Sequence, residues 1–154
     1  MTNLRNLRAM ALLLVLCLLT GCGSAAALPE PAQLAAELLA AAEGPEMSAM
    51  PASYLLEVTG IAPEDYESAV YLLPAGDVAP DELILVRCRD KAAAEAVRRK
   101  LEARLDLKAK AAQSYLTEQL PVIRAGTVRT DGLTVSLLVS ERLDALQAVY
   151  DRFR

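Results

Sequence analysis

The chain has 154 residues, the length of a single domain once a targeting segment is set aside. Hydrophobic residues make up 54% and charged residues 23%, so the composition supports a packed core and argues against disorder. The absence of histidine excludes histidine-based catalytic triads and the commonest nitrogen ligand of zinc, and the net charge of -4 disfavours binding to nucleic acid.

The first 21 residues predict an export signal. Two arginines, Arg5 and Arg8, precede the unbroken apolar run of residues 9–19. Eleven helical residues extend about 16 Å, which is about half of the ~30 Å hydrocarbon core of a bilayer. The run is therefore too short to span a membrane stably and has the length of a signal-peptide core.

The next four residues, Leu19-Thr20-Gly21-Cys22, resemble the lipobox of bacterial lipoproteins at every position. In that family a diacylglyceryl group is attached to the cysteine thiol, and signal peptidase II then cuts before the cysteine. The resemblance implies that Cys22 carries a lipid anchor, with palmitate among its acyl chains, on the extracytoplasmic side of a cell membrane. Two long acyl chains hold firmly where one does not. The alternative is a cytoplasmic protein with a buried N-terminal helix, in which Cys22 is an ordinary apolar thiol.

After the signal peptide (residues 1–21), residues 22–31 predict a lipid-anchored tether and residues 32–154 a single globular domain. A first helix is expected from Pro31 to Glu43, where Gly44-Pro45 ends it. A second, short helix is expected over residues 51–60, with Gly60 at its end.

Two strands are expected next, over residues 65–73 and 82–89. Apolar residues alternate along the second strand, so Ile84, Val86 and Cys88 share one face, and the other face carries Leu83, Leu85, Arg87 and Arg89.

The longest helix is expected from Asp90 to about Leu120, and Pro121 is expected to bend or end it. Its buried side is marked by residues at near-helical spacing: Val97, Leu101, Leu105, Ala112 and Leu116.

A hairpin follows, in which Asp131-Gly132 predicts a type I′ turn. Ser140 is the expected N-cap of a last helix over residues 141–154. The order ααββαββα predicts an α+β fold, with a small antiparallel sheet of about four strands covered by helices.

The mature sequence resembles the uncharacterised family called domain of unknown function 4358, which occurs on small bacterial lipoproteins. The resemblance spans residues 32–153 and rests on four stretches: ELILVRCRD, KAAAEAVRRKLEARL, SYLTEQLPVIRAGTV and DGLTVSLLVS. That family has no established activity or catalytic residues, so the resemblance implies only the lipoprotein character.

Charge is distributed unevenly along the mature chain. Residues 23–86 contain eleven acidic side chains and no basic one, whereas residues 87–110 contain nine basic and four acidic side chains. Lys100, Arg104 and Lys108 recur every four residues and form a ridge on the long helix. We expect this ridge to contact anionic lipid headgroups or an acidic wall polymer. The alternative is a solvated helix face with weak ion pairs, Glu95–Arg99 and Arg98–Glu102.

No motif points to catalysis, a metal or a cofactor. The acidic stretches at residues 64–67 and 77–82 have neither the calcium-loop spacing nor any sign of a glycosidase carboxylate pair, and are expected to mark turns and helix starts. Cys88 lies on an apolar strand face, which favours a structural thiol.

The sequence therefore predicts a non-catalytic binding or interaction module. It would be held in the cell envelope by its lipid anchor, and its partner would be an envelope protein or an anionic wall polymer. The alternative is a small envelope hydrolase that uses carboxylates or a Ser–Lys pair.

Overall fold

The computed structural model describes residues 28–76 and 78–153. The predicted signal peptide, Cys22 and most of the predicted tether lie outside these residues.

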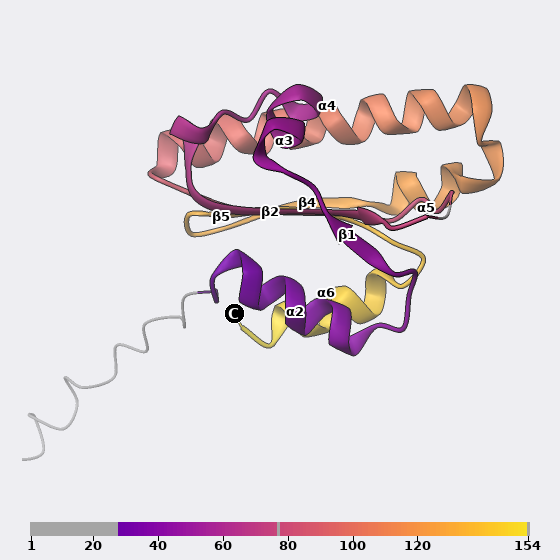
Figure 1. The fold of residues 1–154 in the computed structure, drawn as a ribbon, viewed down its shortest axis with the longest axis horizontal. Helices are drawn as coiled ribbons and strands as arrows, with labels where there is room; N and C mark the ends of the chain where they lie inside the picture. The colour runs from indigo at the N-terminus through magenta and orange to yellow at the C-terminus, as the bar shows by residue number, and fades with distance from the viewer. Residues whose placement is uncertain (1–27, 77, 154) are drawn as a thin grey trace, which may run out of the picture.

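The fold is built around a five-stranded antiparallel sheet with the strand order β1-β2-β3-β5-β4 (Figure 1). The strands are β1 (Met47–Ala49), β2 (Tyr66–Pro74), β3 (Glu82–Cys88), β4 (Thr127–Asp131) and β5 (Thr134–Val139). This confirms the α+β class and the antiparallel sheet, with one strand more than expected. The additional strand, β1, has only three residues, too few to show an alternating pattern in the sequence.

Helices cover both faces of the sheet (Figure 1). One face carries α3 (Ala52–Thr59), α4 (Lys91–Tyr115) and α5 (Leu120–Ala125), and the other carries α2 (Pro31–Ala41) and α6 (Leu143–Asp151). Two single 3₁₀ turns, Pro63–Asp65 and Thr117–Gln119, complete the described elements. The molecule thus has three layers and two cores.

Strand β3 separates the two cores. Its alternating side chains enter opposite layers, as predicted: Ile84, Val86 and Cys88 pack in the core under α4, and Leu83 and Leu85 pack in the core under α2 and α6. All five are at most 2% exposed, so the strand is buried on both faces.

The predicted end of the long helix is wrong. Helix α4 stops at Tyr115, because Leu116 leaves the helical region with φ -141° and ψ 57°. Pro121 lies in the first turn of the next helix, α5, where its missing N–H would have no helical partner in any case. Pro121 therefore starts a helix instead of bending one.

Two local predictions near the C-terminus also need correction. Gly132 has φ +61°, but no described residue other than glycine has a positive φ, so the hairpin has the type II′ pattern and not type I′. Ser140 does not cap the last helix, because α6 begins only at Leu143 with Arg142 before it.

Gly126, between α5 and β4, is required for close packing. Its φ of -51° suits any residue, but an added Cβ would lie 2.7 Å from Val139 Cγ2 and 2.9 Å from the carbonyl oxygen of Ile123. There is no room for a methyl group unless β5 or α5 moves.

We predict that Gly126→Ala lowers the free energy of unfolding by about 1–3 kcal/mol through overpacking. Gly76→Ala is the control, because a Cβ there meets nothing within 4 Å. Urea denaturation followed by circular dichroism measures both, and equal unfolding midpoints would contradict the packing argument.

Candidate functional site

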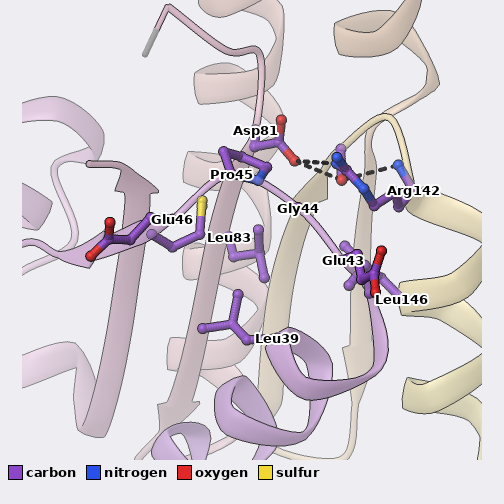
Figure 2. A pocket seen from close by; sticks show the side chains of 12 residues that line it. Leu39, Glu43, Gly44, Pro45, Glu46, Asp81, Leu83, Arg142 and Leu146 are labelled. Carbon is purple, nitrogen blue, oxygen red and sulfur yellow. Dashed lines mark hydrogen bonds and ion pairs between the residues drawn. The ribbon is translucent and has the colours of Figure 1, made fainter. Parts of the chain in front are cut away.

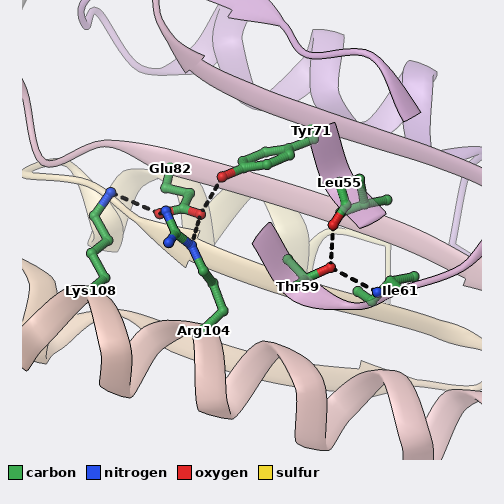
Figure 3. Close-up of polar contacts among 7 residues, drawn as sticks. All are labelled: Leu55, Thr59, Ile61, Tyr71, Glu82, Arg104 and Lys108. Atoms are coloured by element: carbon green, nitrogen blue, oxygen red, sulfur yellow. Dashed lines mark hydrogen bonds and ion pairs between the residues drawn. The ribbon is translucent and has the colours of Figure 1, made fainter. Parts of the chain in front are cut away.

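The three bases of the predicted ridge point toward carboxylates of the domain itself (Figure 3 shows two of them). Lys100 Nζ lies 2.7 Å from Asp65 Oδ2. Arg104 Nε and Lys108 Nζ each lie 2.8 Å from an oxygen of Glu82. The contact with an anionic surface stays a prediction, but each of these charges already has a partner. Helical spacing showed that the bases share a face and gave no sign of what faces them.

Glu82 is the centre of this arrangement. Its side chain is fully buried, and it also accepts a hydrogen bond of 2.8 Å from the hydroxyl of Tyr71. Burial alone would raise the pKa of Glu82, but Lys108 and Arg104 outweigh it and hold the pKa below the usual value of 4.5. Burial and the Glu82 charge raise the pKa of the Tyr71 hydroxyl in turn. Glu82 is therefore an ionised carboxylate held between two cations inside the protein.

The other residues considered for chemistry are placed in structural roles. Cys88 is fully buried, and burial raises the pKa of its thiol to about 11, which disfavours the reactive thiolate. The expected helix pairs Glu95–Arg99 and Arg98–Glu102 are present. Among the described residues, no group of three or more potential ligands is arranged to hold a metal ion, and no serine hydroxyl bonds to a lysine.

A groove lies at the end of the sheet where β3 begins and β5 ends. It consists of two pockets of about 350 and 600 Å³ that share the residues Pro45, Asp81 and Arg142. We call the two pockets together the end groove. The smaller pocket, drawn in Figure 2, has an apolar floor formed by Leu39, Ala42, Met47, Leu83 and Leu146.

The wall shared by the two pockets is polar. Asp81 is only 4% exposed, and its Oδ1 accepts a hydrogen bond of 2.7 Å from Ser140 Oγ. Ser140 Oγ in turn accepts a hydrogen bond of 3.1 Å from the backbone N–H of Arg142. The guanidinium of Arg142 lies farther away, with Nη1 3.9 Å from Asp81 Oδ1. Asp81 Oδ2 has no hydrogen-bond partner among the described residues, and no dashed line reaches it in Figure 2.

Carboxylates surround the end groove. Besides Asp81, the lining acids are Glu43, Glu46, Glu118 and Glu141, and Arg142 is the only base, which gives five negative charges against one positive charge. In the described part of the chain, none of the four glutamate side chains has a hydrogen bond or ion pair.

Sequence reasoning did not find this groove. Asp81 was expected to mark a turn and Ser140 a helix start, and Arg142 was not singled out. The three residues meet because β3 and β5 are paired, with Glu82 opposite Val139. Helices α2 and α6 also contribute residues to the floor. The residues that form the groove are therefore spread over positions 39–146 of the sequence, with no local motif to mark them.

No helix in the described ranges is long and apolar enough to cross a membrane.

The family model for a domain of unknown function, DUF4358, matches residues 41–140. The match covers almost two thirds of the chain, which therefore belongs to this family. This confirms the predicted resemblance, but over residues 41–140 and not 32–153. Helices α2 and α6 lie almost entirely outside the match. No curated protein and no solved structure matches the chain.

We predict that Glu82→Gln lowers the free energy of unfolding at pH 7 by about 3–5 kcal/mol, because it leaves two partly buried cations without their carboxylate. Since the folded-state pKa of Glu82 lies below 4.5, this stabilisation is complete above pH 4.5 and is lost as the pH falls through the folded-state value. The difference in the free energy of unfolding between the wild type and Glu82→Gln should therefore shrink over that pH range.

Glu102→Gln is the matched control for Glu82→Gln. Glu102 pairs with Arg98 on the exposed side of α4, where an ion pair contributes at most about 0.5 kcal/mol. Urea denaturation at a series of pH values measures both variants. The account of Glu82 fails if the two variants are equally stable at pH 7.

Proposed function

We propose that this member of the DUF4358 family is a lipid-anchored, non-catalytic binding module on the extracytoplasmic face of a cell membrane, with the end groove as its binding surface. The observation that carries the proposal is the separation of two features. The chain enters the described domain at one end of the sheet (Figure 1). The end groove lies where β3 begins, at the other end.

The point of entry is well defined. Leu28 is only 7% exposed and packs in the core under α2 and α6. Arg87, near the last residue of β3, donates hydrogen bonds of 2.6 and 3.2 Å to the carbonyl oxygens of Leu28 and Pro29. The described chain is therefore held in the domain from Leu28 onward.

The distance from Cys22 to the packed Leu28 is limited by the number of residues between them. Six residue steps separate Cys22 from Leu28, and they span at most about 21 Å when fully extended. Under the proposal, a lipid on Cys22 holds the Leu28 end of the sheet close to the headgroups.

Under the proposal, the end groove lies at the end of the sheet that is farther from the lipid anchor. It begins at Asp81, and the seven residues of β3 place it about 20 Å along the strand from the Arg87 end. A groove in that position is open to a partner in the envelope, and anchoring raises its local concentration near membrane proteins.

Ser140, the serine that lines the groove, has a structural role. Ser140 donates to Asp81 and accepts from the Arg142 backbone, which links the end of β5 to the start of β3. In the described part of the chain Ser140 bonds to no lysine, so these contacts give no support to the Ser–Lys form of the hydrolase alternative.

We predict that Cys22→Ala abolishes lipid attachment, so that the chain is either released from the membrane fraction or retained with its signal peptide uncleaved. Cys17→Ala is the matched control, because Cys17 lies within the predicted signal peptide and its replacement should leave attachment intact. Membrane fractionation and the intact mass of the mature chain measure the outcome. Normal attachment and an unchanged mature mass in Cys22→Ala would exclude the anchor.

A further inference from the structure

We infer that the end groove binds an extended peptide segment of an envelope protein in which an apolar side chain stands next to a lysine or arginine. This inference rests on the proposed function, because it assigns the occupant of the same surface. Three features of the groove carry it: its charge, the oxygen of Asp81 that has no hydrogen-bond partner among the described residues, and its apolar floor.

The charge of the groove favours a cationic occupant. Glu43 and Glu46 line the smaller pocket, and Glu118 and Glu141 line the larger one; none of these side-chain carboxylates has a partner among the described residues. With Asp81 the acids outnumber the single base by five to one. A cation that enters the groove is attracted from both sides, whereas an anion is repelled.

Asp81 provides a specific contact for that cation. The residue is more than nine-tenths buried, and Ser140 and Arg142 both approach the same oxygen, Oδ1. The second oxygen, Oδ2, belongs to a side chain that lines both pockets and has no partner in the described part of the chain. An ammonium or guanidinium donor in the groove can therefore bond to Oδ2, and a hydrogen bond between two charged groups is stronger than one between neutral groups.

The floor of the smaller pocket adds an apolar requirement. Leu83 and Leu146 are buried, whereas Leu39 is 40% exposed at the end of α2. An apolar side chain placed over Leu39 removes this exposed surface from water. The occupant therefore carries an apolar group beside its positive charge.

Arg142 is the base beside Asp81 in the free protein, on the Oδ1 side of the carboxylate. Its guanidinium lies 3.9 Å from Asp81, beyond hydrogen-bond distance, and donates no hydrogen bond to any described residue. An incoming lysine or arginine can make a closer contact with Asp81 than Arg142 does. The positive charge of Arg142 repels an incoming cation, so its removal should strengthen binding.

The shape of the groove favours a peptide over a compact molecule. Two open pockets lie side by side and share one wall, so an occupant that fills both is elongated. Alternate side chains of an extended segment point in opposite directions, about 3.3 Å apart along the chain. One side chain can then cover the apolar floor while its neighbour reaches Asp81.

The test uses the full-length lipidated protein in zwitterionic detergent and two fluorescein-labelled hexapeptides. One peptide alternates leucine with lysine and the other alternates leucine with glutamate, and fluorescence anisotropy measures binding. We expect saturable binding of the leucine–lysine peptide only. Asp81→Asn should weaken it about tenfold or more, because a hydrogen bond to a charged group is lost. Arg142→Gln should strengthen it.

Matched variants keep the test valid if Asp81→Asn does not fold. Leu39→Ser should weaken binding, whereas Leu56→Ser should not, because Leu56 is equally exposed at 43% but lies on α3, away from the groove. Glu43→Gln with Glu46→Gln should weaken binding more than Glu37→Gln with Glu57→Gln, which changes the net charge by the same amount.

Three results would overturn the inference. They are no saturable binding of the leucine–lysine peptide, equal effects of the groove variants and their controls, and binding of the leucine–glutamate peptide that Arg142→Gln abolishes. The last result would identify an anionic ligand held by Arg142. Fractionation of the same protein reports the Cys22 anchor separately, so loss of peptide binding with intact attachment overturns this inference and not the anchor.

Discussion

The structure depends on the burial of β3 on both faces. A strand in that position must be apolar over its length, and its polar residues are confined to its ends. Glu82 begins the strand and Arg87 lies one residue before its end. Each fixes another part of the chain: Glu82 binds two bases of α4, and Arg87 holds the backbone where the chain enters the domain. The end groove and the entry point are separated because they belong to opposite ends of one buried strand.

This arrangement explains the uneven charge of the sequence. The acids of residues 23–86 and the bases of residues 87–110 are separated along the sequence. Several of them nevertheless pair with one another inside or across the fold, as Glu30 does with Arg87, Asp65 with Lys100 and Glu82 with Lys108. The charge left without partners includes the four glutamates of the end groove. Because the three ridge bases of the long helix are paired with acids of the domain, these glutamates make the end groove a separate acidic surface.

Much of the fold was predictable, because its signals are local. The alternation in residues 82–89 identified β3 and both of its faces, and helical spacing placed Val97 and Leu101 of α4 in the core. The three residues of β1 were too few for a pattern, and the helix end at Leu116 has no proline or glycine to mark it. The groove was beyond sequence reasoning, because its wall and floor join α2, β3, β5 and α6 through contacts that only the folded chain makes.

The central claim is that the end groove is held away from the membrane, and depth-dependent fluorescence quenching tests it most directly. A fluorophore is attached to the lipidated protein at Leu133→Cys, in the hairpin beside the entry point, or at Glu43→Cys in the groove. Cys88 does not compete for the label, because it is fully buried and its thiol has a pKa of about 11. In vesicles with quencher-labelled headgroups, the account predicts stronger quenching at position 133 than at position 43. Equal quenching, or stronger quenching at position 43, would contradict it.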